Sequence, residues 1–151
     1  MKALQRHTFL FREGVWKATG FYIDESGEQT HATGETRITH SRGHWLNEGF
    51  MKMKTRSGEI VLKNSYSILP LKKGQDSTSW VSENQALGRI IGKFTFVGDT
   101  ILSLFGTGNR RYKGTECLVM TGPDSYINRG CLFRGSLKVS SWCVELKKVE
   151  E

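Results

Sequence analysis

The sequence predicts an all-β protein folded as one closed, antiparallel, up-and-down β-barrel of about ten strands. Three observations lead to this fold class: Gly-containing turn signals recur at short intervals, apolar and polar residues alternate between them, and no convincing helix remains. A long meander of twisted strands leaves two unpaired edges unless its first strand pairs with its last, so we expect the sheet to close. A sandwich or jelly roll is the alternative, and the sequential hairpins disfavour it.

The turn signals place Gly beside a polar residue, as tight hairpins require for a positive φ: DESGE, SRGH, RSGE, KKGQD, VGDT, GTGN, TGPD and FRGS. Runs such as ETRITH and YINRGCLF alternate in the way that half-buried strands do. The strands bounded by these turns are expected at residues 14–23, 33–40, 44–55, 59–69, 78–85, 89–97, 100–105, 111–120, 125–133 and 136–147. Only LPLKKGQDST has the composition of a long connection.

Length and composition indicate one domain. With 151 residues and 17 glycines, the chain has the size of a single turn-rich β domain, and we expect residues 1–151 to form it. The first residues, MKALQRHTFLF, lack the apolar run of a secretory signal, and no segment is long enough to span a bilayer. Cys117, Cys131 and Cys143 have no metal-ligand spacing, which predicts reduced, buried thiols, no metal site and a cytoplasmic location.

The formal net charge of +7 would attract an anionic partner. Its densest segments, LKKGQD, GNRRYKG and ELKKVEE, are separate turns or termini, where lysine normally serves solubility. A nucleic-acid surface needs basic residues on one face, interleaved with exposed aromatic residues. The dispersion of the charge therefore disfavours nucleic acid as a partner.

The first strand opens with Gly14, Val15 and Trp16, and the surrounding sequence FREGVWK is similar to the way fatty-acid-binding proteins begin. This G-x-W resembles the lipocalin and fatty-acid-binding branch of the calycin barrels, and the resemblance implies that Trp16 plugs one end of the barrel. A physical reason stands beside it, because a barrel needs a bulky apolar residue where strands converge and Gly allows close approach there.

The chain also departs from particular calycin relatives. Fatty-acid-binding proteins carry two helices between their first two strands, and ESGEQTHAT is too short and too polar to form them. Their cationic pair for a carboxylate near the end of the chain has no clear match. Haem-binding barrels of the nitrobindin type use a histidine late in the chain, whereas all four histidines here lie in the first third, at positions 7, 31, 40 and 44. We therefore expect no haem and no other cofactor.

Period-two alternation places single polar residues on otherwise apolar strand faces. An unpaired polar group inside a barrel costs a few kcal/mol, so each of these needs a protein partner or a ligand. Glu116 and Arg129 lie on adjacent expected strands, and a structural ion pair between them is the alternative to ligand contact. The candidate ligand-binding residues are Asn47, Asn64, Asn84, Glu116, Tyr126, Arg129 and Trp142.

These observations favour the binding of a small, largely apolar molecule inside the barrel. An enzyme of the isomerase or cyclase type on the same scaffold is the first alternative, with Glu116 or Tyr126 as acid or base and no recognisable catalytic motif. A basic nucleic-acid-binding barrel is the second alternative.

Overall fold

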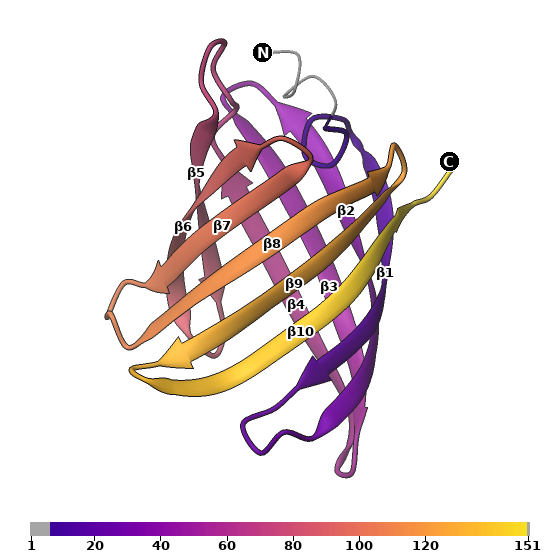
Figure 1. Ribbon diagram of the computed structural model, residues 1–151, viewed down its shortest axis with the longest axis vertical. Coiled ribbons are helices and arrows are strands. Elements are labelled where there is room, and N and C mark those ends of the chain that lie inside the picture. The colour runs from indigo at the N-terminus through magenta and orange to yellow at the C-terminus, as the bar shows by residue number, and fades with distance from the viewer. Residues whose placement is uncertain (1–6, 151) are drawn as a thin grey trace.

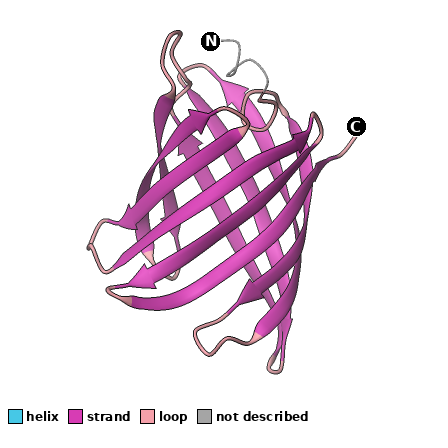
Figure 2. Ribbon diagram, viewed as in Figure 1, coloured by secondary structure: helices cyan, strands magenta, loops and turns pink. Residues whose placement is uncertain are grey.

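The computed structural model describes residues 7–150, which form ten β-strands and no helix (Figure 1; Figure 2). Across these residues, then, no helix is available that could cross a membrane. The strands are β1 (Gly14–Ile23), β2 (Gln29–Ser41), β3 (His44–Thr55), β4 (Gly58–Ile68), β5 (Ser77–Asn84), β6 (Gly88–Val97), β7 (Thr100–Thr107), β8 (Tyr112–Gly122), β9 (Ser125–Arg134) and β10 (Leu137–Lys148).

All ten strands belong to one closed antiparallel sheet. Each strand pairs with its neighbours in the chain, and β1 pairs with β10 from Trp16↔Lys148 to Ile23↔Ser141. In Figure 1 the yellow β10 lies beside the indigo β1, at the seam where the sheet closes. The predicted fold class, a closed up-and-down barrel of ten strands, is confirmed.

The strand boundaries agree with the prediction to within two residues, except at the start of β2. This strand begins at Gln29 and already pairs with Ile23, four residues before the predicted start. The reason is a tight turn held by Asp24, whose Oδ1 accepts the backbone N–H groups of Ser26 and Glu28 at 2.9 Å each. This side chain closes the turn early, so the polar segment that follows joins the sheet.

One end of the barrel is closed by residues 7–12, which precede β1. Phe9 and Leu10 are buried there together with Trp16, whose exposed fraction is 0%. The indole of Trp16 meets the rings of Phe9 and Tyr126 edge-on, with centroid distances of 5.3 and 5.7 Å. Trp16 thus lies in the plug that the resemblance implied.

A buried histidine holds this plug to the strands. His7 Nε2 donates to the carbonyl oxygen of Gly98 at 2.9 Å, so Nδ1 is the acceptor for the hydroxyl of Tyr126 at 2.8 Å. The Tyr126 oxygen also accepts the backbone N–H of Thr8 at 3.2 Å. Burial lowers the pKa of His7, against the opposing effects of the Gly98 carbonyl and Asp99, which favours this neutral tautomer.

The barrel wall is incomplete between β4 and β5. These strands pair only at Tyr66↔Ser82, Ser67↔Val81 and Ile68↔Trp80, whereas β3 and β4 pair over the whole of β4. The two strands diverge below Tyr66, and in Figure 1 the β3–β4 hairpin reaches the bottom of the view while β5 stays at the left. Residues 59–65 of β4 therefore have no strand neighbour on the β5 side.

Candidate ligand-binding cavity

A cavity of about 300 Å³ lies inside the barrel, and every strand contributes to its lining. Most of the lining is apolar or aromatic, which suits a small organic ligand. It extends to the place where β4 and β5 diverge, with Leu62 and Asn64 in its lining from β4, Asn84 from β5 and Leu87 from the turn after β5. The aromatic and sulfur-containing residues of the lining are Phe9, Phe21, Tyr22, Phe50, Met51, Met53, Tyr66, Trp80, Phe94, Phe105 and Trp142.

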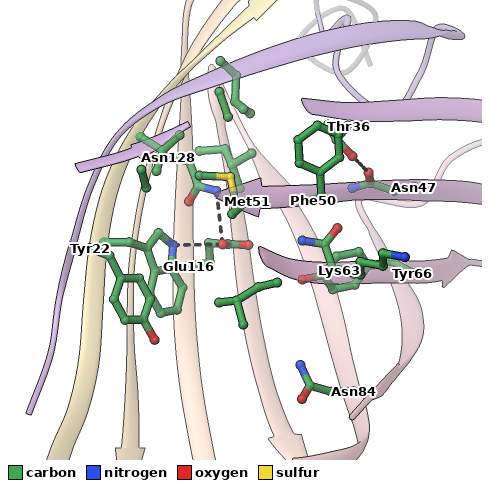
Figure 3. Close-up of a pocket in the computed structure, with 18 of the residues that line it drawn as sticks. Tyr22, Thr36, Asn47, Phe50, Met51, Lys63, Tyr66, Asn84, Glu116 and Asn128 are labelled. Carbon is green, nitrogen blue, oxygen red and sulfur yellow. Dashed lines mark hydrogen bonds between the residues drawn. The ribbon is translucent and has the colours of Figure 1, made fainter. Parts of the chain in front are cut away.

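The polar centre of the cavity is a row of three residues on β8, β9 and β10. Glu116 is opposite Gly130, and Gly130 is opposite Trp142. Because Gly130 has no side chain, the indole of Trp142 lies across it, and a Cβ at this position would be 2.3 Å from the ring. Trp142 Nε1 thereby reaches Glu116 Oε2 and donates to it at 3.1 Å (Figure 3).

Glu116 receives a second bond from the next residue along the inner face of β9. Asn128 Nδ2 donates to the same oxygen, Oε2, at 3.1 Å (Figure 3). Burial raises the pKa of Glu116, and the two donors offset this only in part. The second carboxyl oxygen, Oε1, has no hydrogen-bond partner among residues 7–150.

Tyr66 and Glu116 influence each other electrostatically across the cavity. Burial raises the pKa of the Tyr66 phenol, and the charge of Glu116 raises it further. The Tyr66 ring is fixed edge-on against Trp80, with a centroid distance of 5.0 Å. At neutral pH the phenol therefore keeps its proton and is a hydrogen-bond donor at the cavity wall.

Two more polar atoms in this region have no protein partner. Asn128 Oδ1 and Ser140 Oγ are both buried and make no hydrogen bond within the described part of the chain. Buried polar atoms are almost always paired, and an unpaired one costs about 1–3 kcal/mol. Asn128 also binds Glu116 through Nδ2, so Asn128 Oδ1 and Glu116 Oε1 form a hydrogen-bonding corner that the protein alone does not satisfy, and Ser140 Oγ is a separate unpaired atom of the lining.

Five of the seven predicted site residues line the cavity: Asn47, Asn64, Asn84, Glu116 and Trp142. Asn47 is paired there, since its Oδ1 accepts the hydroxyl of Thr36. Asn84 Oδ1 accepts the backbone N–H groups of Ala86 and Leu87 at 2.8 and 2.9 Å, so it also stabilises the β5–β6 turn. Asn64 and Asn84 line the cavity from β4 and β5, at positions where these two strands no longer pair.

The structure places the other two predicted residues elsewhere. Tyr126 is fully buried in the plug, where His7 and Thr8 bind its hydroxyl. Arg129 is exposed on the outer face of β9, opposite Cys117 and Cys143. The predicted ion pair between Arg129 and Glu116 is wrong, because adjacent residues of a strand point to opposite faces and Asn128 takes the inner one.

The cysteines also differ from the prediction. Cys117, Cys131 and Cys143 are free thiols, but all three are half-buried on the outer side of β8–β10 rather than enclosed in the core. No group of three or more His, Cys, Asp or Glu side chains within residues 7–150 is placed to hold a metal ion.

Tyr66, Asn128 and Ser140 are functional candidates that the sequence prediction missed. The alternation of β4 and β9 does place Tyr66 beside Asn64 and Asn128 beside Tyr126 on the inner faces. Ser140 also alternates in register with Trp142 and Val144, because the shift in the pairing of β10 with β9 lies on its N-terminal side, between Lys138 and Ser140. Alternation thus places all three residues on inner faces, but it does not show which inner-facing polar atoms lack a partner.

Fold and site together define a closed ten-stranded antiparallel barrel with an internal cavity, in which Glu116 is held by two hydrogen bonds on one oxygen. No protein-family model and no curated protein sequence matches the chain. Among solved structures, the S-type phycobiliprotein lyase CPES from Guillardia theta is similar, with a TM-score of 0.68, 10% sequence identity, and coverage of 99% of this chain and 92% of that one. This likeness supports a calycin-like fold.

An N-terminal dehydratase from the difficidin assembly line also matches, at 8% identity over 95% of this chain and 80% of that one. Its TM-score of 0.29 is too low to bear on the fold.

Proposed function

We propose that the protein binds a small, largely apolar molecule inside the barrel. The observation that carries this proposal is the cavity of about 300 Å³, in which an apolar lining surrounds one unsatisfied hydrogen-bonding corner. Burial of an apolar ligand in such a space supplies affinity, and a few polar groups fix its orientation. The likeness of the whole barrel to the phycobiliprotein lyase CPES is consistent with a ligand-holding barrel.

The corner also indicates the polar chemistry of the ligand. Both donors to Glu116 meet Oε2, which leaves Oε1 for the cavity (Figure 3). Ionised Glu116 and Asn128 Oδ1 would both accept from N–H or O–H groups, and a protonated Glu116 would donate to a carbonyl oxygen. We therefore expect a ligand with an apolar body and a compact hydrogen-bonding group, N–H or O–H in the first instance.

Titration with the apolar fluorescent amine N-phenyl-1-naphthylamine tests this proposal. We expect saturable one-to-one binding with micromolar affinity, and a roughly tenfold weaker affinity in Glu116→Gln if the probe amine bonds to the carboxylate. Glu145→Gln is the matched control, because Glu145 is exposed on β10 outside the cavity and should leave binding unchanged. Absence of saturable binding to the folded protein would contradict the proposal. Native mass spectrometry of the freshly purified protein is a second test of the proposal, in which we expect a co-purified small molecule.

An enzyme of the isomerase or cyclase type is the second candidate function. The observation that favours it is a buried acid with a raised pKa facing a protonated phenol across the cavity, an arrangement suited to proton transfer. In this case Glu116 would exchange a proton with the bound molecule, and Tyr66 would donate a hydrogen bond. Conversion of a bound ligand by the wild type, lost in Glu116→Gln while binding persists, distinguishes this candidate from simple binding.

Two expectations from the sequence remain predictions. The basic segments lie on the β4–β5 connection, the β7–β8 turn and the C-terminal residues, which are far apart in Figure 1, so we do not propose a nucleic-acid surface. We expect the protein to work in the cytoplasm, where three free thiols stay reduced.

A further inference from the structure

The divergence of β4 from β5 leaves a strand edge without a partner. Residues 59–65 of β4 pair with β3 on one side, and on the other side β5 pairs only from Tyr66 onward. Within the part of the chain that the structure describes, no other strand takes this side of β4. Such an edge presents a row of backbone N–H and C=O groups that can pair with another strand.

The same segment exposes apolar side chains. Ile60, Val61 and Leu62 are 42%, 45% and 44% exposed, and they follow one another in the sequence. Exposed Leu104 and Val97, by contrast, belong to strands that are paired on both sides. Only on β4 do an unpaired edge and a continuous apolar run coincide within residues 7–150.

The residues along this edge are self-complementary. About a twofold axis at Val61, antiparallel pairing of two β4 edges would place Glu59 opposite Lys63 of the other copy, and Ile60 opposite its Leu62. The ion pair between Glu59 and Lys63 would occur twice, once on each side of the axis. Neither Glu59 nor Lys63 has an ion-pair partner among the described residues of its own chain.

We propose that the protein forms a homodimer in which β4 of one copy pairs antiparallel with β4 of the second, centred on Val61. The free stretch suits this register, because residues 58–64 of β4 would pair with one another and β5 pairs with β4 only from Tyr66 onward. Opposite charges at mirrored positions favour this arrangement, and parallel in-register pairing would set Glu59 against Glu59. A second copy of β4 carries the complementary charges at the matching positions, and for this reason we infer a second copy rather than an unrelated strand as the partner.

Charge reversal along the edge tests the dimer, with sedimentation velocity across the micromolar to sub-millimolar range as the measurement. We expect a reversible dimer for the wild type. Glu59→Lys alone sets Lys against Lys63 twice, and Lys63→Glu alone sets Glu against Glu59 twice. Each single reversal should raise the dissociation constant by roughly tenfold to a hundredfold. The double variant Glu59→Lys/Lys63→Glu restores opposite charges and should restore dimerisation.

Leu104→Lys is the control, since it removes a more exposed apolar residue, 70% exposed, from a strand that is already paired on both sides. It should leave the dimer intact. Both charged positions are exposed, so the variants should fold, and circular dichroism checks this. A wild type that stays monomeric throughout, a dimer indifferent to the single reversals, or a double variant that stays monomeric would each overturn the proposal. If the wild type stays monomeric, a strand from a different protein is the occupant of the β4 edge that remains to be tested.

Discussion

Glu116 receives its two hydrogen bonds on one oxygen while the rest of the carboxyl faces the cavity. Two neutral donors lower the free energy of the ionised form, but burial raises it by more, and the net result is a raised pKa. Glu116 is thus incompletely hydrogen-bonded in the empty protein. A ligand that donated a hydrogen bond to Oε1 would stabilise the ionised carboxylate and lower the free energy of the folded state.

The raised pKa predicts how stability depends on pH. The folded protein holds the Glu116 proton more tightly than the unfolded chain does, so ionisation destabilises the folded state as pH rises from the ordinary value of 4.5 through the folded-state pKa. Glu116→Gln cannot ionise. Its free energy of unfolding should therefore rise relative to that of the wild type across this window, with no such change below it. Urea denaturation at a series of pH values measures the difference, and a constant difference would contradict the burial of this charge.

At the scale of strands, three aromatic rings lie over glycines of the neighbouring strand. Added Cβ atoms at Gly92, Gly114 and Gly130 would each be 2.3 Å from a ring, those of Trp80, Phe105 and Trp142 respectively. Each glycine and its aromatic residue are directly opposite in the sheet. A pairing of this kind lets large rings lie flat on the barrel wall and leaves the centre of the barrel open.

Gly130→Ala tests this arrangement where it matters for the site. The new methyl group would push the indole of Trp142 off β9 and break its hydrogen bond to Glu116, so we expect the free energy of unfolding to fall by about 1–3 kcal/mol. Probe binding should weaken as well. Gly108→Ala is the control, since the nearest atom to its added Cβ is 3.9 Å away, and its stability should change by less than about 0.5 kcal/mol. Equal effects of the two substitutions, measured by thermal and urea denaturation, would contradict this role of Gly130.

At the scale of the whole molecule, short turns and alternation were enough to predict the barrel and the inner position of Glu116. Alternation tells which face a residue occupies but not its height along the barrel, so it placed Tyr126 in the site when Tyr126 lies in the plug. The plug itself, residues 7–12, has no repeating pattern. The early separation of β4 from β5 depends on pairing lengths between strands, which the sequence of either strand alone does not specify.

A substitution that fills the cavity tests whether the ligand binds inside the barrel. Ala32 lines the cavity from β2 with 3% of its surface exposed, opposite Gly20 and Met53. Ala32→Leu would place three more carbon atoms in the space that a ligand would use. We expect probe affinity to fall about tenfold while the free energy of unfolding stays equal or rises by about 1 kcal/mol, as cavity-filling substitutions commonly give.

Opposite changes in binding and stability are specific to an interior that is kept empty for a ligand. Thr19→Leu is the control, since it adds a larger apolar side chain on the exposed face of β1 and should leave probe affinity unchanged. Fluorescence titration and urea denaturation of the same samples give both quantities. If Ala32→Leu binds the probe as tightly as the wild type, the probe occupies some other surface. If Ala32→Leu destabilises the fold by several kcal/mol, the barrel around Ala32 is already filled to capacity, and the cavity is too small to hold a ligand there.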